Sequence, residues 1–116
     1  MDKIISKIIA LGIPGLVLLM VVASGGLAGG AALVAALAVL GGPLGMAGGI
    51  VALGLLVLIA NAISEYGFEA LYERTVAGLR AKGVSDADIL RAIDKYPISR
   101  ALKLSLKETV RNNGRS

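Results

Sequence analysis

From Ile8 to Ser64 the sequence contains no charged residue, which is an uninterrupted run of 57 positions. A soluble domain of 116 residues has room for one modest core, and such a run has no ordinary place in it. As one helix the run would be about 85 Å long, against a bilayer hydrocarbon core of about 30 Å. Because backbone groups in lipid must be satisfied within a segment, we expect several crossing helices. The run predicts an all-α integral membrane protein.

Paired glycines and Pro43 divide the run into three expected helical segments, at residues 4–24, 27–40 and 43–64. Pro43 suits the first position of the third helix. The middle segment would reach only about 21 Å, so it either re-enters or crosses obliquely in a protected interior. We therefore predict a glycine-rich transmembrane hairpin of two to three segments. The predicted membrane domain covers residues 1–64, and a cytoplasmic helical region with a disordered tail covers residues 65–116.

The first segment begins with an interfacial pattern, because isoleucines share one helical face while Lys3 and Lys7 lie on the other. Pro14 removes a backbone donor, so a kink or helix break is expected near it. The N-terminus is then a surface helix followed by a shorter inserted helix. A rival interpretation is a secretory signal ending at Ala23, although the segment from Pro43 would remain a membrane span in either case.

Two rows of small residues indicate close helix packing. In lipid, small residues at every third or fourth position let helix backbones approach each other. The rows either join protomers into a homo-oligomer or pack the helices of one protomer together. Each glycine in a helix lowers helix stability by about 1 kcal/mol relative to alanine. Close helix contacts are expected to compensate for this loss. The alternative is that the helices are metastable and move from a compact form to an inserted one. The candidate packing residues are Gly25, Ala28, Gly29, Ala32, Gly41, Gly45, Gly48, Gly49 and Ala52.

Two charged patterns follow the run. Glu65, Glu69 and Glu73 are spaced by four, and we expect them on one face of a continuation of the third helix. They form either a solvated face or, in an oligomer, an acidic pore mouth that favours cations. Further along, a basic row serves either solubility or contact with anionic headgroups. Its members are Arg100, Lys103, Lys107 and Arg111.

Local signals place helix ends in the C-terminal region. Gly83 is expected to stop the helix after the membrane run. Ser85 and Asp88 have the spacing of a capping box, so a helix should begin there. Pro97 should end that helix near Tyr96. The last two helices are predicted to form an amphipathic hairpin against the end of the long helix.

Basic residues flank both sides of the run. Lys3 and Lys7 stand against Asp2 at the N-terminal side, and ten Lys/Arg stand against seven Asp/Glu from residue 65 onward. By the positive-inside rule both termini should be cytoplasmic, with the protein multi-pass in the inner or plasma membrane. The net charge of +4 favours anionic headgroups as partner over nucleic acid, because few aromatic side chains are present for base stacking.

The residue inventory excludes several chemistries. Cysteine and histidine are absent, so thiol nucleophiles, imidazole bases and zinc sites have no residues to form them. The run carries no carboxylate of the kind that a proton relay requires. We expect no enzyme activity, no cofactor and no metal.

Two functions remain as predictions. The first is a self-assembling membrane protein that forms an oligomeric pore or channel, for example a membrane-disrupting effector. The second is a non-conducting membrane anchor or scaffold that recruits a cytosolic protein through its C-terminal helices. The layout of short N-terminus, glycine-rich spans and charged tail resembles that of small holin-type and other pore-forming membrane proteins. That resemblance covers the whole chain and assigns no residue roles.

Overall fold

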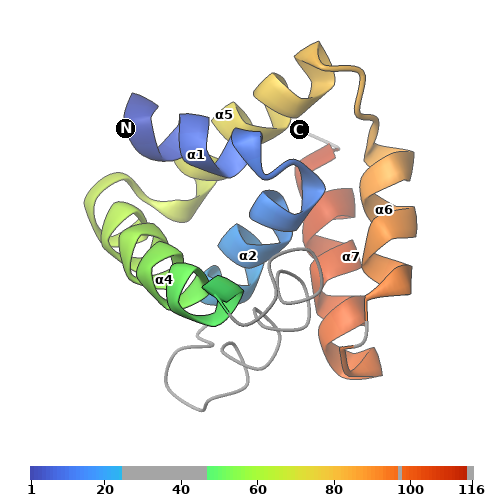
Figure 1. Ribbon diagram of the computed structural model, residues 1–116. Helices are drawn as coiled ribbons and strands as arrows, with labels where there is room; N and C mark the ends of the chain where they lie inside the picture. Colours follow the sequence, from blue (N-terminus) through green and yellow to red (C-terminus); the bar gives the residue numbers. More distant parts are fainter. Residues whose placement is uncertain (25–46, 97, 115–116) are drawn as a thin grey trace.

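The computed structural model describes residues 1–24, 47–96 and 98–114, and for residues 47–53 and 114 only the backbone. The described residues form helices and no strand, so the prediction of an all-α protein is confirmed. Figure 1 shows the helices gathered around α2, which contacts each of the others. The helices are α1 (Asp2–Ala10), α2 (Ile13–Ala23), α4 (Ala47–Tyr66), α5 (Phe68–Ala81), α6 (Asp86–Lys95) and α7 (Arg100–Gly114).

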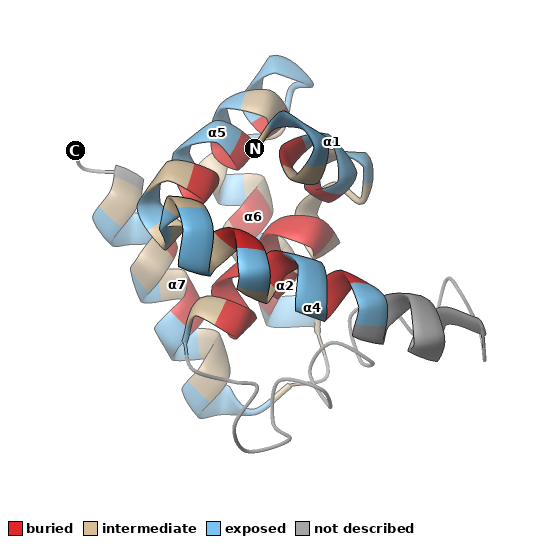
Figure 2. Cartoon of the chain, turned by 90° about the vertical axis from the view of Figure 1, so that its left-hand side faces the viewer, coloured by how far each residue is buried: buried red, intermediate tan, exposed pale blue. Residues whose placement is uncertain are grey.

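Helix α2 is the centre of the molecule. It is apolar on every side, and each residue from Gly15 to Val22 is buried. The visible parts of α2 are red in Figure 2, behind α4. Full burial of one leucine or valine side chain contributes about 1.5–3 kcal/mol. A helix that is hydrophobic all round belongs either in a protein core or in a bilayer. In this arrangement the surrounding helices supply the apolar environment.

The predicted break near Pro14 is confirmed. Helix α1 ends at Ala10, and Gly12, with a φ of 73°, precedes α2, which has Pro14 in its first turn. A φ in this range costs glycine little and other residues much. As predicted, α1 is amphipathic: Ile5 is buried, whereas Lys3 and Lys7 are exposed. The corner lets α1 fold back onto α2.

A sharp bend separates α4 from α5. The two helices meet at Gly67, which has a φ of 87°, and their axes differ by 115°. Residues from α1 contact both arms. The amino group of Met1 donates to the Tyr66 hydroxyl at 3.0 Å, and Arg74 on α5 pairs with Asp2 at 2.9 Å. The expected continuation of the third helix through Glu69 and Glu73 is therefore wrong. Helix α4 ends at Tyr66, and Gly67 turns the chain into α5.

No described helix is by itself both long and apolar enough to cross a bilayer. The residues of α4 and α5 from Gly54 to Ala81 meet the length and composition criteria only as a bent pair. Helix α2 is apolar, and it is only 11 residues long. The predicted segment 27–40 lies outside the described residues.

The C-terminal signals predicted the helix ends well. Gly83, with a φ of 90°, follows α5. The Ser85 hydroxyl accepts a hydrogen bond from the Asp88 backbone at 3.2 Å, and the Asp88 carboxylate accepts one from the Ser85 backbone at 2.9 Å, which completes the capping box. Helix α6 ends at Lys95, before Pro97. Helices α6 and α7 pack together as the predicted hairpin, but the hairpin packs against α2 and not against the end of the long helix, because α2 is apolar on every side.

The boundary predicted after residue 64 lies inside α4. Helices on either side of it share one hydrophobic core, since α5, α6 and α7 all contact α2. Leu71 and Leu79 on α5, Ile93 on α6 and Leu106 on α7 are almost fully buried in it. The packing of the described residues therefore does not divide at residue 64.

Candidate functional site

Most of the predicted packing residues lie outside the described part of the chain. Gly48, Gly49 and Ala52 are in the first half of α4, where only the backbone is described. The two small-residue rows therefore stay predictions. The members outside the described residues are Gly25, Ala28, Gly29, Ala32, Gly41 and Gly45.

The acidic residues do not form one helical stripe. Glu65 is on α4, whereas Glu69 and Glu73 are on α5, and the bend at Gly67 lies between them. All three side chains are exposed. The even spacing by four would bring them onto one face only in a continuous helix. The expectation of a single face is thus corrected, because Gly67 redirects the chain.

The basic row on α7 is divided by contacts with α6. The Lys103 ammonium donates to the Asp94 backbone carbonyl at 2.8 Å, and Lys107 forms an ion pair with the Asp94 carboxylate. Arg100 and Arg111 are exposed and form no ion pair with the described residues. Two of the four predicted headgroup contacts therefore already hold the α6–α7 hairpin together.

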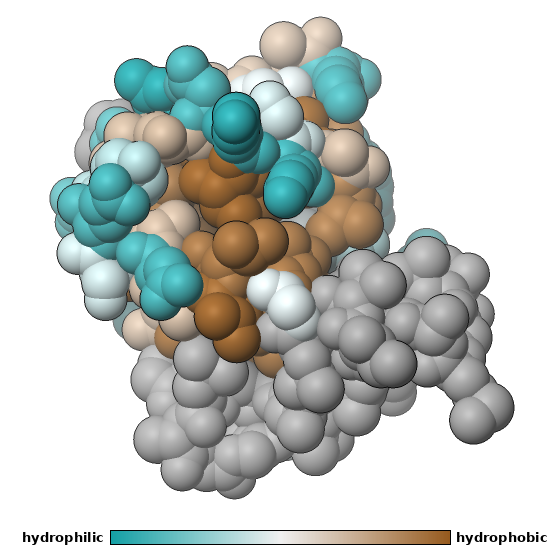
Figure 3. Space-filling model, turned by 60° about the vertical axis from the view of Figure 1, so that its left-hand side comes forward, coloured by the Kyte–Doolittle hydropathy of each residue, from teal (hydrophilic) through white to brown (hydrophobic). Residues whose placement is uncertain are grey.

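An open groove of about 420 Å³ runs between the end of α1 and the middle of α4. Figure 3 shows apolar side chains gathered on this side of the molecule, with hydrophilic side chains next to them. Val57 and Leu58 on α4 are 57% and 44% exposed, which is high for large apolar side chains. The groove is lined by Lys7, Ala10, Leu11, Gly54, Leu55 and Leu58.

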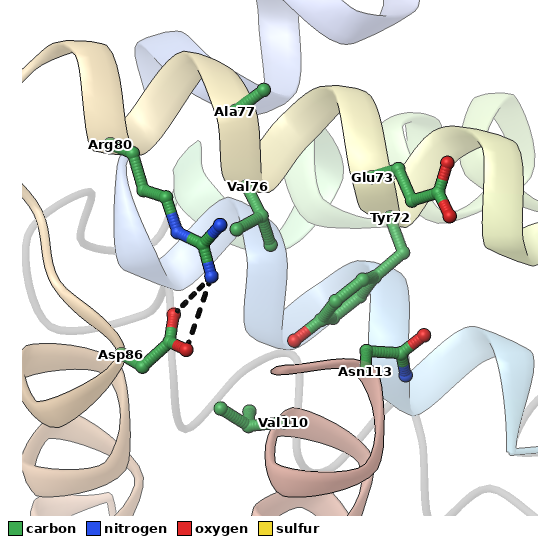
Figure 4. A pocket seen from close by; sticks show the side chains of 8 residues that line it. All are labelled: Tyr72, Glu73, Val76, Ala77, Arg80, Asp86, Val110 and Asn113. Atoms are coloured by element: carbon green, nitrogen blue, oxygen red, sulfur yellow. Dashed lines mark hydrogen bonds and ion pairs between the residues drawn. The ribbon is translucent and has the colours of Figure 1, made fainter. Parts of the chain in front are cut away.

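A second hollow, of about 210 Å³, lies where α5, α6 and α7 meet. Figure 4 shows Arg80 and Asp86 at its rim, joined by two contacts of 3.0 and 3.1 Å. Tyr72, Val76 and Val110 form its apolar wall. An exposed pair of this kind contributes at most about 1 kcal/mol. The hollow combines these apolar side chains with the Arg80–Asp86 pair, and Glu73 and Asn113 also line it.

The environment of Tyr72 predicts a pH dependence. Burial, with a smaller contribution from nearby Asp86, raises its pKa to about 12. In the unfolded chain the phenol ionises near the ordinary tyrosine pKa of 10.0. The contribution of Tyr72 to stability is therefore complete below that pH and is lost as pH rises toward 12. We expect the free energy of unfolding to fall over this range. Tyr72→Phe should remove part of the fall, as measured by urea denaturation at a series of pH values; an unchanged slope would contradict the burial of this phenol.

Sequence reasoning missed two glycines that the structure places at close contacts. A Cβ on Gly15 would clash with the backbone carbonyl of Ile8, and a Cβ on Gly78 would clash with the Ile9 side chain. Both belong to the junction of α1 with α2 and α5. The adjacent Pro14 marked the chain break, but the close approach itself depends on contacts that follow only from the fold.

Within the described residues, no group of three or more acidic side chains could hold a metal ion. Comparison of the chain with protein-family models, with curated proteins and with solved structures gave no match. The function is therefore argued from the residues and their arrangement.

Proposed function

We propose that the protein is a membrane-active protein that inserts in the cell membrane as a multi-pass protein and self-assembles into an oligomeric pore or channel. Both termini are placed on the cytoplasmic side, the bilayer is the principal partner, and no catalysis takes place. The observation that carries this proposal is the uncharged run of residues 8–64, to which the all-apolar helix α2 belongs.

The packing of α2 supports a change of environment. Its side chains lie in a core formed by the surrounding helices, and the outer face of one of these helices, α4, itself exposes Val57 and Leu58. Lipid tails are as apolar as leucine, so α2 and its neighbours in the run would lose no apolar environment on entering a bilayer. The compact bundle and an inserted form then use the same residues. This is the metastable alternative for the glycine-rich segments that the sequence left open.

Assembly is assigned to the predicted rows of small residues, which allow close backbone contact between helices in lipid. In a closed oligomer the exposed Glu65, Glu69 and Glu73 would contribute negative charge near the end of the run, which favours cations. Helices α4 and α5 are bent relative to each other in the compact bundle. Glu65 would therefore lie at a different depth along the pore from Glu69 and Glu73, unless the bend between the two helices straightens.

Release of size-graded dyes from anionic liposomes tests the proposal. We expect the purified protein to release dyes up to a size limit, and Gly45→Leu or Gly49→Leu to abolish release, because a leucine separates the close-packed backbones. Asn61→Leu is the matched control, because Asn61 is exposed on α4 and lies off the row of small residues. Release that survives both substitutions, or a protein that inserts and leaves vesicles intact, would overturn the pore.

The hollow between α5, α6 and α7 favours a second candidate function, the membrane anchor or scaffold. A short segment of a cytosolic protein would dock at the rim of this hollow, beside the exposed Ala77 and the Arg80–Asp86 pair. In that case the full chain in vesicles should retain a specific protein, and Ala77→Glu, at an exposed position on the rim, should release it while Gly45→Leu has little effect. The full chain is required because the C-terminal helices share their core with α2.

A further inference from the structure

The outward face of α4 changes character along the helix. Gly54, Val57 and Leu58 are exposed toward its N-terminal side, and Asn61 and Glu65 are exposed toward its C-terminal side. From Val57 to Glu65 the axis rises by about 12 Å. The same outer face is therefore apolar at one end and polar at the other, whereas Leu56 and Ile59 on the opposite face are buried.

Positive charge lies beside the apolar end. Lys7 lines the groove next to Leu58, and Lys3, one turn earlier on α1, lines a neighbouring hollow with Leu58, Asn61 and Glu65. Neither lysine forms an ion pair with the described residues. Of the two acidic residues that line the hollow with Lys3, Asp2 is paired with Arg74, and Glu65 is exposed and forms no ion pair with the described residues. The α1–α4 face, defined by Lys3, Lys7, Gly54, Val57 and Leu58, thus joins unpaired ammonium groups to exposed apolar side chains.

We infer that the α1–α4 face seats the compact protein on an anionic lipid surface. Val57 and Leu58 lie among the upper acyl chains, and Lys3 and Lys7 extend to the lipid phosphates. Lysine can bury its alkyl stem and keep its ammonium in the headgroup layer. Interfacial helices bury their apolar face by about 5–10 Å. Val57 and Glu65 are about 12 Å apart along the axis of α4. When α4 is tilted with Val57 toward the lipid, Glu65 therefore stays in water.

This face differs from the one predicted by the sequence, which was the basic row of α7. There, Lys103 and Lys107 are held by Asp94. Leu104 is as exposed as Val57, at 55%, yet it stands among charged residues rather than beside a groove. The inference rests on the proposed membrane function and names the part of the surface that makes the first contact.

The absence of tryptophan from the chain allows a direct test. In the full-length protein, Val57→Trp introduces one reporter on the α1–α4 face, and Leu104→Trp introduces a matched reporter on α7. Vesicles of phosphatidylcholine with phosphatidylglycerol should shift the emission of the Val57→Trp protein to the blue, and brominated lipids should quench it. The Leu104→Trp protein should show neither effect. The reverse result, or equal shifts in both variants, would overturn the inference.

Binding measurements with the same vesicles provide the second arm. Each exposed lysine near an anionic surface contributes roughly five-fold to binding, so Lys3→Gln/Lys7→Gln should weaken binding roughly 25-fold. Arg100→Gln/Arg111→Gln should weaken it far less, and pure phosphatidylcholine vesicles should bind poorly. Equal loss from both double variants would contradict the inference.

A lipid-free control uses the tryptophan reporter again. A blue shift of the Val57→Trp protein that grows with protein concentration without lipid would show an interface between two copies instead.

The outcomes separate this inference from the proposed pore. Vesicles that bind through the α1–α4 face and retain their dye support the docking face and overturn the pore. Dye release combined with an equal loss of binding in the Lys3→Gln/Lys7→Gln and Arg100→Gln/Arg111→Gln proteins supports the pore and overturns the docking face. Vesicles that bind nothing overturn both.

Discussion

Replacing Gly15 by alanine is expected to lower the free energy of unfolding by about 1–3 kcal/mol, the usual cost of forcing a methyl group into a packed site. Its Cβ would meet the backbone carbonyl of Ile8, and a carbonyl cannot rotate away as a side chain can. The whole α1–α2 corner has to move. Urea denaturation followed by circular dichroism, in lipid-free buffer, measures the change.

Gly54→Ala is the control for this substitution. Gly54 is also helical, and no atom lies within 4 Å of the added Cβ. Alanine should therefore stabilise the protein by about 0.5–1 kcal/mol through reduced backbone entropy in the unfolded chain. Opposite signs for two identical glycine-to-alanine changes would verify the close contact of α1 with α2. Stabilisation by both would show that α1 does not pack against α2 as described.

Shortening Leu18 in α2 is expected to lower the free energy of unfolding by about 2–5 kcal/mol, since Leu18→Ala removes a fully buried side chain and leaves a cavity. Leu18→Asp should leave the chain largely unfolded, because its carboxylate would be buried without a partner. Chemical denaturation in lipid-free buffer measures the first effect, and loss of the cooperative transition reports the second.

Leu104→Ala provides the comparison for Leu18→Ala, because the same atoms are removed from a side chain that is 55% exposed. Its effect should stay within about 0.5 kcal/mol. If Leu18→Ala were equally mild, α2 would not be enclosed by the other helices. In vesicles the two changes should become more alike, since lipid can fill the space that the leucine leaves.

The sequence predicted the local features of the fold because each rests on neighbouring residues. Pro14 and Gly12 end α1, Gly83 ends α5, and the pairing of Ser85 with Asp88 begins α6. These signals depend on backbone donors and on φ alone, which a short stretch of sequence specifies. The amphipathic hairpin of α6 and α7 also followed from periodicity.

The surroundings of the helices could not be predicted in the same way. An apolar pattern around all of α2 is common to buried helices and membrane helices, so the packing by α5, α6 and α7 had no signal of its own. The engagement of Lys103 and Lys107 by Asp94 depends on how α6 and α7 align. Gly67 was the only indication that α4 would not continue, and one glycine is compatible with either outcome.

The first two residues of the chain brace the bend at Gly67, because Met1 contacts Tyr66 on one arm and Asp2 contacts Arg74 on the other. The bend angle and the position of α1 are therefore mechanically coupled. Exposed pairs such as Asp2–Arg74 hold weakly, at about 1 kcal/mol or less, so this brace is easily released. A surface that draws α1 away would remove these two contacts from both arms at once, while the packing of α4 and α5 against α2 remains.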